Sequence, residues 1–304
     1  MPDKTTSVGV LDAEEDNLLR KRTWKDTTFF IVLKQFSRNK LALFGLVIVL
    51  LLVLMGIFAP LIAPYDYSAI DPIHANQGPS AAHWFGTDIY GRDILSRIFY
   101  GARTSLAIGV GSGLIGTIVG IIFGSIAGYF GGIAETLILR ACDVLQSIPN
   151  MLLCIIVSQT LGRGMLPTMV ALSMYSIPQI VRILRSTMLS LREQEFIEAS
   201  RAINCSNLRI LLSHILPNSL SPVIVSFSLT IGMKIIASAG LSYLGLGVQE
   251  PIAEWGAMIA LGKTQLRYAP HIVLFPGLFV ALVVMAFNFV GDGLRDSIDP
   301  KQRR

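Results

Sequence analysis

The sequence predicts an all-α integral membrane protein, on the basis of its composition and its long uncharged stretches. Of the 304 residues, 52% are hydrophobic and only 15% are charged, whereas soluble domains contain about 25% charged residues. Uncharged stretches occupy residues 41–65, 104–134, 144–162 and 164–181. A helix of about 20 apolar residues crosses a bilayer core about 30 Å thick. This composition argues against an ordinary soluble enzyme and against a disordered chain.

Six transmembrane helices are expected from these stretches and from two later ones that each contain a single histidine. Their approximate bounds are 41–63, 104–130, 138–160, 165–184, 218–241 and 271–291. The third must begin in a segment that contains charged residues, so its start is the least well defined. The first 30 residues contain no apolar run followed by a small-residue cleavage site, and we therefore expect no removable signal peptide.

A further helix is expected before the first span, within residues 1–40. Apolar side chains recur at helical spacing opposite polar ones, with Trp24 nearby. The apolar set is Phe29, Val32, Leu33 and Phe36, and the polar set is Lys25, Asp26, Lys34 and Gln35. This pattern is typical of a helix that lies along the membrane surface.

The distribution of lysine and arginine predicts that both termini are cytoplasmic. With the N-terminus inside, 18 of the 25 basic residues lie on the cytoplasmic side and six on the opposite side. Cytoplasmic loops of membrane proteins are enriched in basic residues. The net charge of +5 therefore has a membrane explanation, and we expect no nucleic-acid partner. A membrane protein with several crossings agrees with this pattern.

Small residues recur every four positions along the second predicted span. The series contains Ser112, Gly116, Gly120, Gly124, Gly128 and Gly132. One helix face without side-chain bulk lets another backbone approach closely. We expect a close helix contact there, either as ordinary intramembrane packing or at a moving or subunit interface.

Residue patterns for catalysis or for metal binding are lacking in this sequence. The four histidines are scattered, and Cys142, Cys154 and Cys205 have no paired spacing. Gly256 and Gly262-Lys263-Thr264 resemble a phosphate-binding loop, but five residues separate the glycines where four are required. We therefore expect no catalytic residue, no bound cofactor and no metal in this chain.

Residues 182–217 form a cytoplasmic segment that is too long and too regular for a simple connection. In its first half, apolar residues fall on one side of a helix and charged residues occupy the rest. Asn204 interrupts the pattern, Ser206 is a favourable N-cap, and a second helix is expected from Leu208 until Pro217 ends it. This predicts a helix–turn–helix, either as a solvated amphipathic hairpin or, as we favour, as a surface for a partner protein.

This hairpin resembles the EAA loop of bacterial ABC-importer permeases. The family pattern runs Glu-Ala-Ala, three residues, Gly, nine residues, Ile, one residue and Leu-Pro. The matching positions are Glu198, Ala199, Ser200, Asn204, His214, Leu216 and Pro217. Ser200 replaces the second alanine, His214 the isoleucine and Asn204 the glycine. Because asparagine tolerates left-handed backbone conformations better than most residues, we expect the turn to be preserved.

Two further blocks resemble the dipeptide, oligopeptide and nickel branch of these permeases. The block before the second span contains Gly86-Thr87-Asp88, Gly91-Arg92-Asp93, Ser96-Arg97 and Gly101-Ala102-Arg103. The C-terminal block contains Gly291-Asp292-Gly293-Leu294-Arg295-Asp296 and Asp299-Pro300, and Trp255-Gly256 and Phe275-Pro276-Gly277 lie between the two blocks. The resemblance extends from about residue 25 to the end. It is strongest to the second, C-type permease subunit of a dipeptide or oligopeptide transporter.

The resemblance implies a binding-protein-dependent permease fold, a location in the bacterial plasma (inner) membrane with several crossings, and a set of partners. A sister permease would complete the translocation pathway, two ATP-binding subunits would hydrolyse ATP with Mg²⁺ beneath it, and an extracytoplasmic protein would deliver the substrate. The residues implied in coupling to the ATPase are Glu198, Ala199, Ser200, Ala202, Asn204, Leu216 and Pro217. Nickel or another small solute is the alternative substrate. A stand-alone secondary transporter is the alternative class, but no inverted repeat or chain of intramembrane ionisable residues favours it.

The corresponding organisation has five parts. Residues 1–40 form the cytoplasmic tail and interfacial helix, 41–63 the first span, and 64–103 an extracytoplasmic segment. Residues 104–291 form a five-helix core that contains the EAA loop at 186–217. Residues 292–304 form a second cytoplasmic tail.

A single charge, Lys234, lies deep within the fifth predicted span. It follows Asn218 by 16 residues, or about 24 Å along a helix. A charge at the bilayer centre costs ~2.5–3.5 kcal/mol on insertion scales. Two interpretations remain open. The ammonium either snorkels to the interface along its own stem, or it faces the substrate pathway or a carboxylate of the sister subunit or of the substrate.

Overall fold

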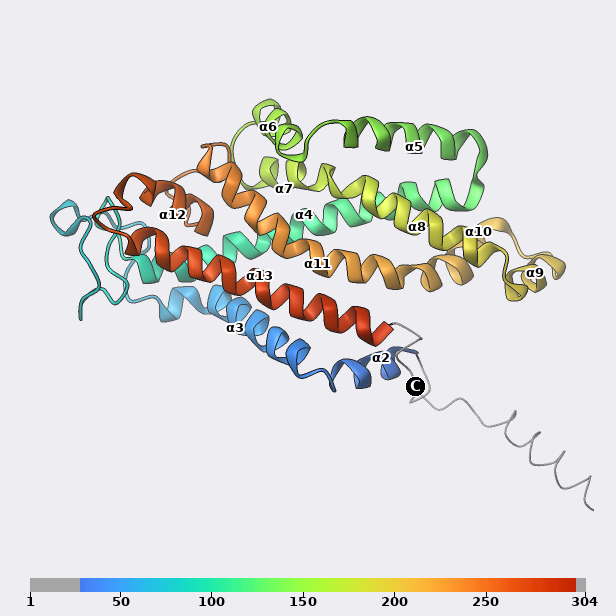
Figure 1. Ribbon diagram of the computed structural model, residues 1–304, viewed down its shortest axis with the longest axis horizontal. Helices are drawn as coiled ribbons and strands as arrows, with labels where there is room; N and C mark the ends of the chain where they lie inside the picture. Colours follow the sequence, from blue (N-terminus) through green and yellow to red (C-terminus); the bar gives the residue numbers. More distant parts are fainter. Residues whose placement is uncertain (1–27, 299–304) are drawn as a thin grey trace, which may run out of the picture.

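Four long helices form the body of the protein in a computed structural model, which describes residues 28–298 (Figure 1). They are α3 (Lys40–Ile62), α4 (Ile94–Phe130), α11 (Leu216–Tyr243) and α13 (His271–Ile298). α3, α4 and α13 are long and apolar enough to cross a membrane, and so is the continuous helical stretch Asn207–Tyr243 that contains α11. Within the described residues there is no strand, only an isolated bridge between Thr87 and Asp93. The all-α prediction is therefore confirmed.

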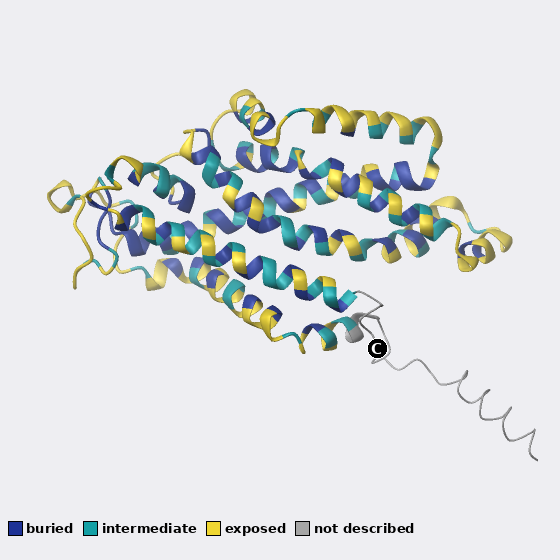
Figure 2. Cartoon of the chain, viewed as in Figure 1, coloured by how far each residue is buried: buried dark blue, intermediate teal, exposed yellow. Residues whose placement is uncertain are grey.

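Shorter helices surround these four and connect them. They are α2 (Thr28–Phe36), α5 (Gly132–Ser147), α6 (Asn150–Leu161), α7 (Met165–Met174), α8 (Ser176–Arg192), α9 (Glu195–Ala202), α10 (Asn207–Ile210) and α12 (Trp255–Gly262). The outer faces of α3 and α5 are exposed along their length (Figure 2). Large apolar side chains occupy these faces, among them Leu51 on α3 and Leu137 on α5. An exposed apolar surface of this extent is typical of contact with lipid.

The third predicted span is a pair of helices and not one straight helix. Residues 138–160 were expected to be continuous, but α5 and α6 meet at an angle of 96°. Pro149 lacks an amide hydrogen, and it disfavours the helical conformation in the preceding residue. Ile148 accordingly adopts an extended conformation, with φ −92° and ψ 128°. The proline therefore bends the span.

The second and fourth predicted spans also differ from expectation. α4 begins at Ile94 rather than at Thr104, because Asp93 caps it by accepting hydrogen bonds from the Ser96 amide (2.8 Å) and hydroxyl (2.7 Å). Charged residues near this start interrupt the apolar pattern, so the pattern predicts a later start of the helix. The fourth predicted span corresponds to two helices, α7 and α8, joined at Tyr175. Because α8 continues to Arg192, the connection between α8 and α11 is shorter than predicted.

The two ends of the described chain lie together. The Asn39 amide group donates a hydrogen bond to the Asp296 carboxylate at 3.4 Å, and Phe36 of α2 is buried beside Gly293 of α13. Figure 1 shows both ends on the same side of the molecule as α9. Trp24, Lys25 and Asp26 lie outside the described residues, so the membrane-surface role of this first helix stays a prediction.

The glycine face of α4 lies against α8. A Cβ atom at Gly120 would lie 2.6 Å from the Cβ of Ile180, and one at Gly124 would lie 3.1 Å from the Cα of Val181. Gly116 and Gly128 face α8 in the same way. Gly132 does not belong to this contact, because it begins α5 and has open space around it. The close approach occurs within this chain, which corresponds to the ordinary packing interpretation.

A buried ion-pair network joins the segment before α4 to the loop after α11. Arg92 donates to Asp88 at 2.7 Å, and Arg97 donates to Glu250 at 3.1 Å. Glu250 also pairs with Arg92. The Arg97 side chain is fully buried, and that of Glu250 is 35% exposed. Burial acts to raise the pKa of Glu250, but the hydrogen bonds and charges of the two arginines outweigh it and hold that pKa below 4.5.

Gly120→Leu should prevent assembly, whereas Ile118→Leu should be tolerated. Leucine at position 120 would force α4 away from α8, and overpacking of this kind costs about 1–3 kcal/mol or more. Ile118 is 56% exposed and serves as the matched control. The yield of assembled complex in detergent measures the effect. Equal yields from the two variants would contradict the packing role of the glycine face.

Glu250→Gln should lower the free energy of unfolding by about 2 kcal/mol at neutral pH. Removing one partner of a fully buried pair costs ~3–5 kcal/mol, and partial exposure of Glu250 reduces this. Thermal unfolding of the detergent-solubilised complex measures the change. Glu193→Gln, at an exposed position, should have no effect.

The difference between wild type and Glu250→Gln should depend on pH. Because the folded-state pKa of Glu250 is lowered from 4.5, its stabilisation is present above pH 4.5. It is lost as the pH falls through the folded-state value. The two melting temperatures should therefore converge in acid. A gap that does not narrow on acidification below pH 4.5, as far as the wild-type complex stays folded, would contradict the ionic origin of the stabilisation.

Candidate functional site

Residues 195–210 form a short helical hairpin, the α9–α10 hairpin, that projects from one end of the molecule (Figure 1). Asn204 forms its turn with φ 59°, so the predicted left-handed conformation is confirmed. The Cys205 amide donates to the Ser200 carbonyl, and the Asn204 amide to the Arg201 carbonyl, which is a Schellman ending of α9. Ser206 caps α10 by accepting from the Arg209 amide at 3.4 Å.

Buried side chains fix the hairpin to the membrane helices. Ile197 of α9 and Ile210 of α10 are fully buried, in a cluster with Leu184 and Met188 of α8. The Tyr129 hydroxyl, at the end of α4, donates to the Asn207 side chain at 2.9 Å. The hairpin is therefore packed against α8 and hydrogen-bonded to α4.

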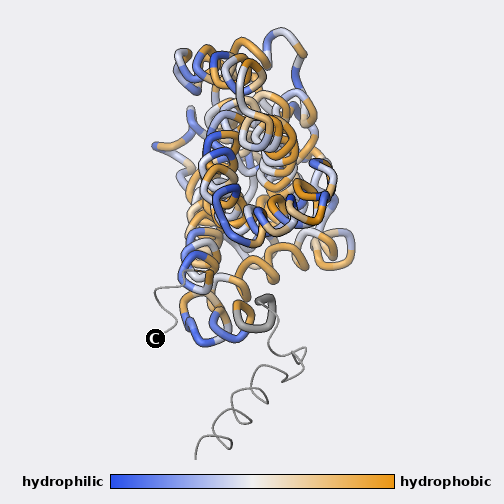
Figure 3. The backbone as a smooth tube through the Cα atoms, turned by 90° about the vertical axis from the view of Figure 1, so that its right-hand side faces the viewer, coloured by the Kyte–Doolittle hydropathy of each residue, from blue (hydrophilic) through white to orange (hydrophobic). Residues whose placement is uncertain are grey.

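The outer surface of the hairpin combines apolar and polar side chains. Phe196, Ile203 and Leu208 are exposed, and so are Glu198, Ala199 and Ala202. Ser200 instead faces inward, and its hydroxyl donates to the Phe196 carbonyl at 2.7 Å. Hydrophobic and hydrophilic segments are mixed when the molecule is viewed from this end (Figure 3). Such a surface is typical of a protein interface.

Pro217 does not end the second helix of the hairpin, contrary to the sequence prediction. α10 continues through one π-helical turn, Leu211–Ile215, into α11, and the Leu216 amide donates to the Leu211 carbonyl five residues earlier. A proline has no amide hydrogen to donate. The π-helical turn before Pro217 accommodates this, and the helix continues without a break. Leu216 and Pro217 therefore lie at the start of the membrane helix, outside the hairpin turn.

Lys234 is turned into the protein and is 6% exposed. Its Nζ atom donates to the Leu172 carbonyl at 3.0 Å, the Ser176 hydroxyl at 3.0 Å and the Ser112 carbonyl at 3.4 Å. These groups belong to α7, α8 and α4. The snorkelling interpretation is therefore wrong, because the ammonium finds its hydrogen-bond partners at the joint between α7 and α8.

A cavity of about 510 Å³ lies beside Lys234. It is lined by residues of α6, of α7–α8 and of α11. The polar lining includes Asn150, Ser176, Gln179 and Thr230, and the apolar lining includes Met151, Met233 and Ile236. Its volume falls in the range of small-molecule sites, about 300–1,000 Å³.

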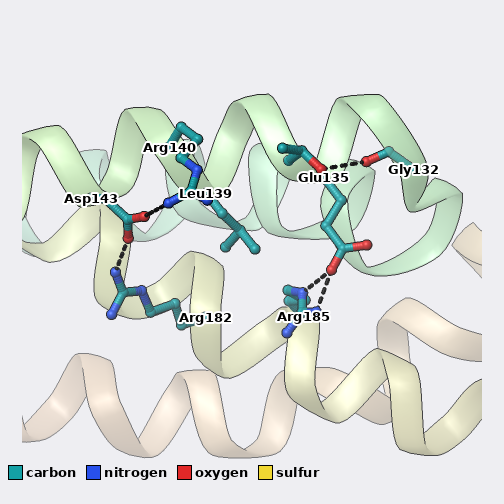
Figure 4. A pocket seen from close by; sticks show the side chains of 8 residues that line it. Gly132, Glu135, Leu139, Arg140, Asp143, Arg182 and Arg185 are labelled. Atoms are coloured by element: carbon teal, nitrogen blue, oxygen red, sulfur yellow. Dashed lines mark hydrogen bonds and ion pairs between the residues drawn. The ribbon is translucent and has the colours of Figure 1, made fainter.

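Ion pairs connect α5 to α8 near the hairpin end, and the sequence analysis did not predict them. Glu135 pairs with Arg185, and Asp143 accepts from Arg182 at 2.7 Å. Figure 4 shows these side chains around a cavity of about 630 Å³, with Arg140 at its edge. The three-residue spacing of Arg182 and Arg185 was a possible signal. It required knowledge that α5 lies beside α8.

Glu254 is a buried carboxyl group that the sequence analysis also missed. It accepts from the Ala257 amide at 2.7 Å and from the Ser242 hydroxyl at 2.9 Å, and it thereby caps α12. Burial raises the pKa of this group above 4.5, and the hydrogen bonds offset part of that effect. A group of three or more side chains that could hold a metal ion is not present in residues 28–298.

Comparison with protein families gives two matches. Residues 120–304 match the binding-protein-dependent transport system inner membrane component. Residues 27–79 match the N-terminal transmembrane domain of oligopeptide transport permease C. The second match covers α2 and α3, and the first begins within α4.

Several curated relatives are similar over most of their length. The dipeptide transport system permease protein DppC of Alkalihalophilus pseudofirmus is 43% identical, covering 95% of this chain and 93% of the relative. The glutathione transport system permease protein GsiD of Pectobacterium atrosepticum is 45% identical, with coverage of 88% and 89%. The oligopeptide transport system permease protein OppC of Bacillus subtilis is 40% identical, with coverage of 96% and 94%.

A solved structure shares the fold. A chain of the inward-facing MetNI methionine ABC transporter aligns with a TM-score of 0.53 and 20% identity, covering 66% of this chain and 94% of that chain. The family matches and the relatives that align over most of their length show that the chain belongs to the family of binding-protein-dependent transport system inner membrane components.

Proposed function

We propose that the chain is the C-type permease subunit of an ATP-driven importer for dipeptides or oligopeptides. The similar permeases named above belong to transport systems for dipeptides, oligopeptides and glutathione. This similarity favours a peptide as the substrate over nickel or another small solute. The importer would contain a sister permease, two ATP-binding subunits that hydrolyse ATP with Mg²⁺, and an extracytoplasmic substrate-binding protein. A stand-alone secondary transporter is disfavoured by the family match.

The proposed topology has six crossings with both termini in the cytoplasm. The four long helices and the bent pair α5–α6 supply up to five candidate spans, and the joined pair α7–α8 would supply the sixth. The contact between Asn39 and Asp296 supports an even number of crossings, because it brings the two ends of the described chain to one side. The excess of basic residues supports the cytoplasm as that side.

The α9–α10 hairpin is the proposed coupling element, and its arrangement is the observation that carries this function. It exposes an apolar surface outside the bundle while Ile197 and Ile210 anchor it to the membrane helices. Glu198, Ala199, Ala202 and Asn204 would face the ATP-binding subunit. Ser200 would hold α9 in shape, and Leu216 and Pro217 would join the hairpin to α11. Closure of the ATPase dimer would then move α8 and α11 together.

The cavity beside Lys234 is proposed to lie on the translocation pathway. α8 and α11 both line it, and both continue directly to the coupling hairpin. A movement of the hairpin would therefore change the cavity. The glycine face of α4 would maintain the position of α8 during this movement.

Cysteine crosslinking should place the hairpin against the ATPase. In a background with Cys205 replaced by serine, Ala202→Cys should crosslink to the co-expressed ATP-binding subunit through a bifunctional thiol reagent. Ser200→Cys, whose side chain is buried, is the matched control and should crosslink far less. Labelling of Ala202→Cys in intact cells by an impermeant thiol reagent would contradict the proposed topology.

Asn204→Val should uncouple ATP hydrolysis from transport. The turn requires φ 59°, which a β-branched residue resists, and the left-handed conformation costs roughly 1–2 kcal/mol. Asn204→Gly keeps the turn and should transport normally. Substrate uptake per ATP hydrolysed, measured in proteoliposomes, separates the two variants. Normal coupling in Asn204→Val would exclude a role for the turn.

A further inference from the structure

The ammonium group of Lys234 has no carboxylate partner within residues 28–298. The other buried cations of the described chain do have such partners, since Arg92 and Arg97 pair with Asp88 and Glu250. No described Asp or Glu oxygen lies within 4.0 Å of the Lys234 nitrogen. Buried charges in proteins are generally paired, and this one is not.

The three hydrogen-bond partners of Lys234 are neutral groups that orient it. The Leu172 carbonyl belongs to the last turn of α7, where carbonyl groups lack helical partners. The Ser176 hydroxyl accepts from Lys234 and donates to the Ser173 carbonyl at 2.8 Å. The Ser112 carbonyl is the most distant acceptor, at 3.4 Å, and Ser112 does not line the cavity, whereas Leu172, Ser176 and Lys234 do. These contacts hold the ammonium in place and leave its charge uncompensated.

The cavity beside this charge combines features that suit a small amphipathic anion. Gln179, Asn150 and Thr230 offer neutral hydrogen-bonding groups, whereas Met151, Met233 and Ile236 offer apolar surface. Ligand sites typically combine an apolar lining with a few polar groups that fix orientation. The side chains that line this cavity include no acidic residue, so nothing in the lining opposes a negatively charged ligand.

We infer that Lys234 binds the carboxylate group of the transported solute in this cavity. The chemical class is a small carboxylate-bearing amphipathic molecule, and the C-terminal carboxylate of a peptide is the form that follows from the proposed function, on which this inference rests. The carboxylate would accept a hydrogen bond from the Lys234 ammonium on the cavity side, where Leu172 and Ser176 lie, and a further one from the Gln179 amide. Lys234 would thus distinguish solutes with a free carboxylate from those without one.

A charge-selective labelling experiment tests the anion site without knowledge of the natural substrate. The complete transporter complex carries Gln179→Cys, with Cys142, Cys154 and Cys205 replaced by alanine. Labelling rates are compared for the anionic sulfonatoethyl and the cationic trimethylammonioethyl methanethiosulfonate. Lys234→Met should lower the anion-to-cation rate ratio by about fivefold or more, because a nearby positive charge attracts the anionic reagent and repels the cationic one.

Three matched variants separate electrostatic attraction from structural support. Lys234→Arg keeps the charge and should keep the rate ratio. Ser176→Ala removes one neutral partner of Lys234 and should also keep it, although it disturbs the same joint. The ratio at Leu208→Cys, on the distant hairpin, should not respond to Lys234→Met. A rate ratio at Gln179→Cys that does not change in Lys234→Met would overturn the inference. The same unchanged ratio is expected if Lys234 pairs with a carboxylate of the sister subunit, and that pairing would also overturn the inference.

A transport experiment then tests carboxylate recognition. Proteoliposomes with the complete complex and its binding protein are supplied with alanyl-alanine or alanyl-alanine amide. The wild-type complex should have a lower KM for the free dipeptide, and Lys234→Met should lose this preference while it retains assembly. A preference that survives in Lys234→Met would overturn carboxylate recognition. Failure of the wild-type complex to transport any peptide would contradict the proposed substrate, and the labelling ratio would still decide the anion site.

Discussion

The close approach of α4 and α8 is the constraint on which the arrangement depends. Gly116, Gly120, Gly124 and Gly128 remove side-chain volume from one face of α4, so that α8 lies almost backbone to backbone against it. Neither water nor a hydrophobic driving force acts between helices in lipid, and close van der Waals contact therefore contributes much of their association. Because α8 leads directly into the α9–α10 hairpin, the same contact determines where the hairpin projects.

Buried basic side chains occur in two different electrostatic environments, one with carboxylate partners and one without. At the end that contains α12, two arginines and two carboxylates neutralise one another and connect segments that are distant in the sequence. Near the joint of α7 and α8, Lys234 is held only by neutral oxygen atoms. The first arrangement suits a rigid structure, since every charge has a partner. The second leaves an attraction that only a further molecule can satisfy.

Interruptions of the helices occur next to the groups proposed to function. Pro149 bends the third span beside the cavity, and the joint at Tyr175 provides the α7 carbonyl that Lys234 contacts. The π turn before Pro217 lies between the hairpin and α11. Breaks of this kind free backbone groups from helical hydrogen bonds, and in a membrane they occur where protein or a cavity can satisfy those groups.

The sequence alone determined the α-helical membrane class, the hairpin and its left-handed turn at Asn204, because these depend on local properties: apolar length, amphipathic spacing and the conformational tolerance of one residue. It also indicated that the glycine face would contact another helix, although not which one. Only the tertiary structure decided that this helix is α8, that α4 begins at Ile94, and that Arg92 and Arg97 are buried with Glu250. It also decided that Lys234 turns inward. These features depend on contacts between segments that are far apart in the chain. The periodic pattern of one helix does not indicate which distant segment packs against that helix or compensates a charged residue on it.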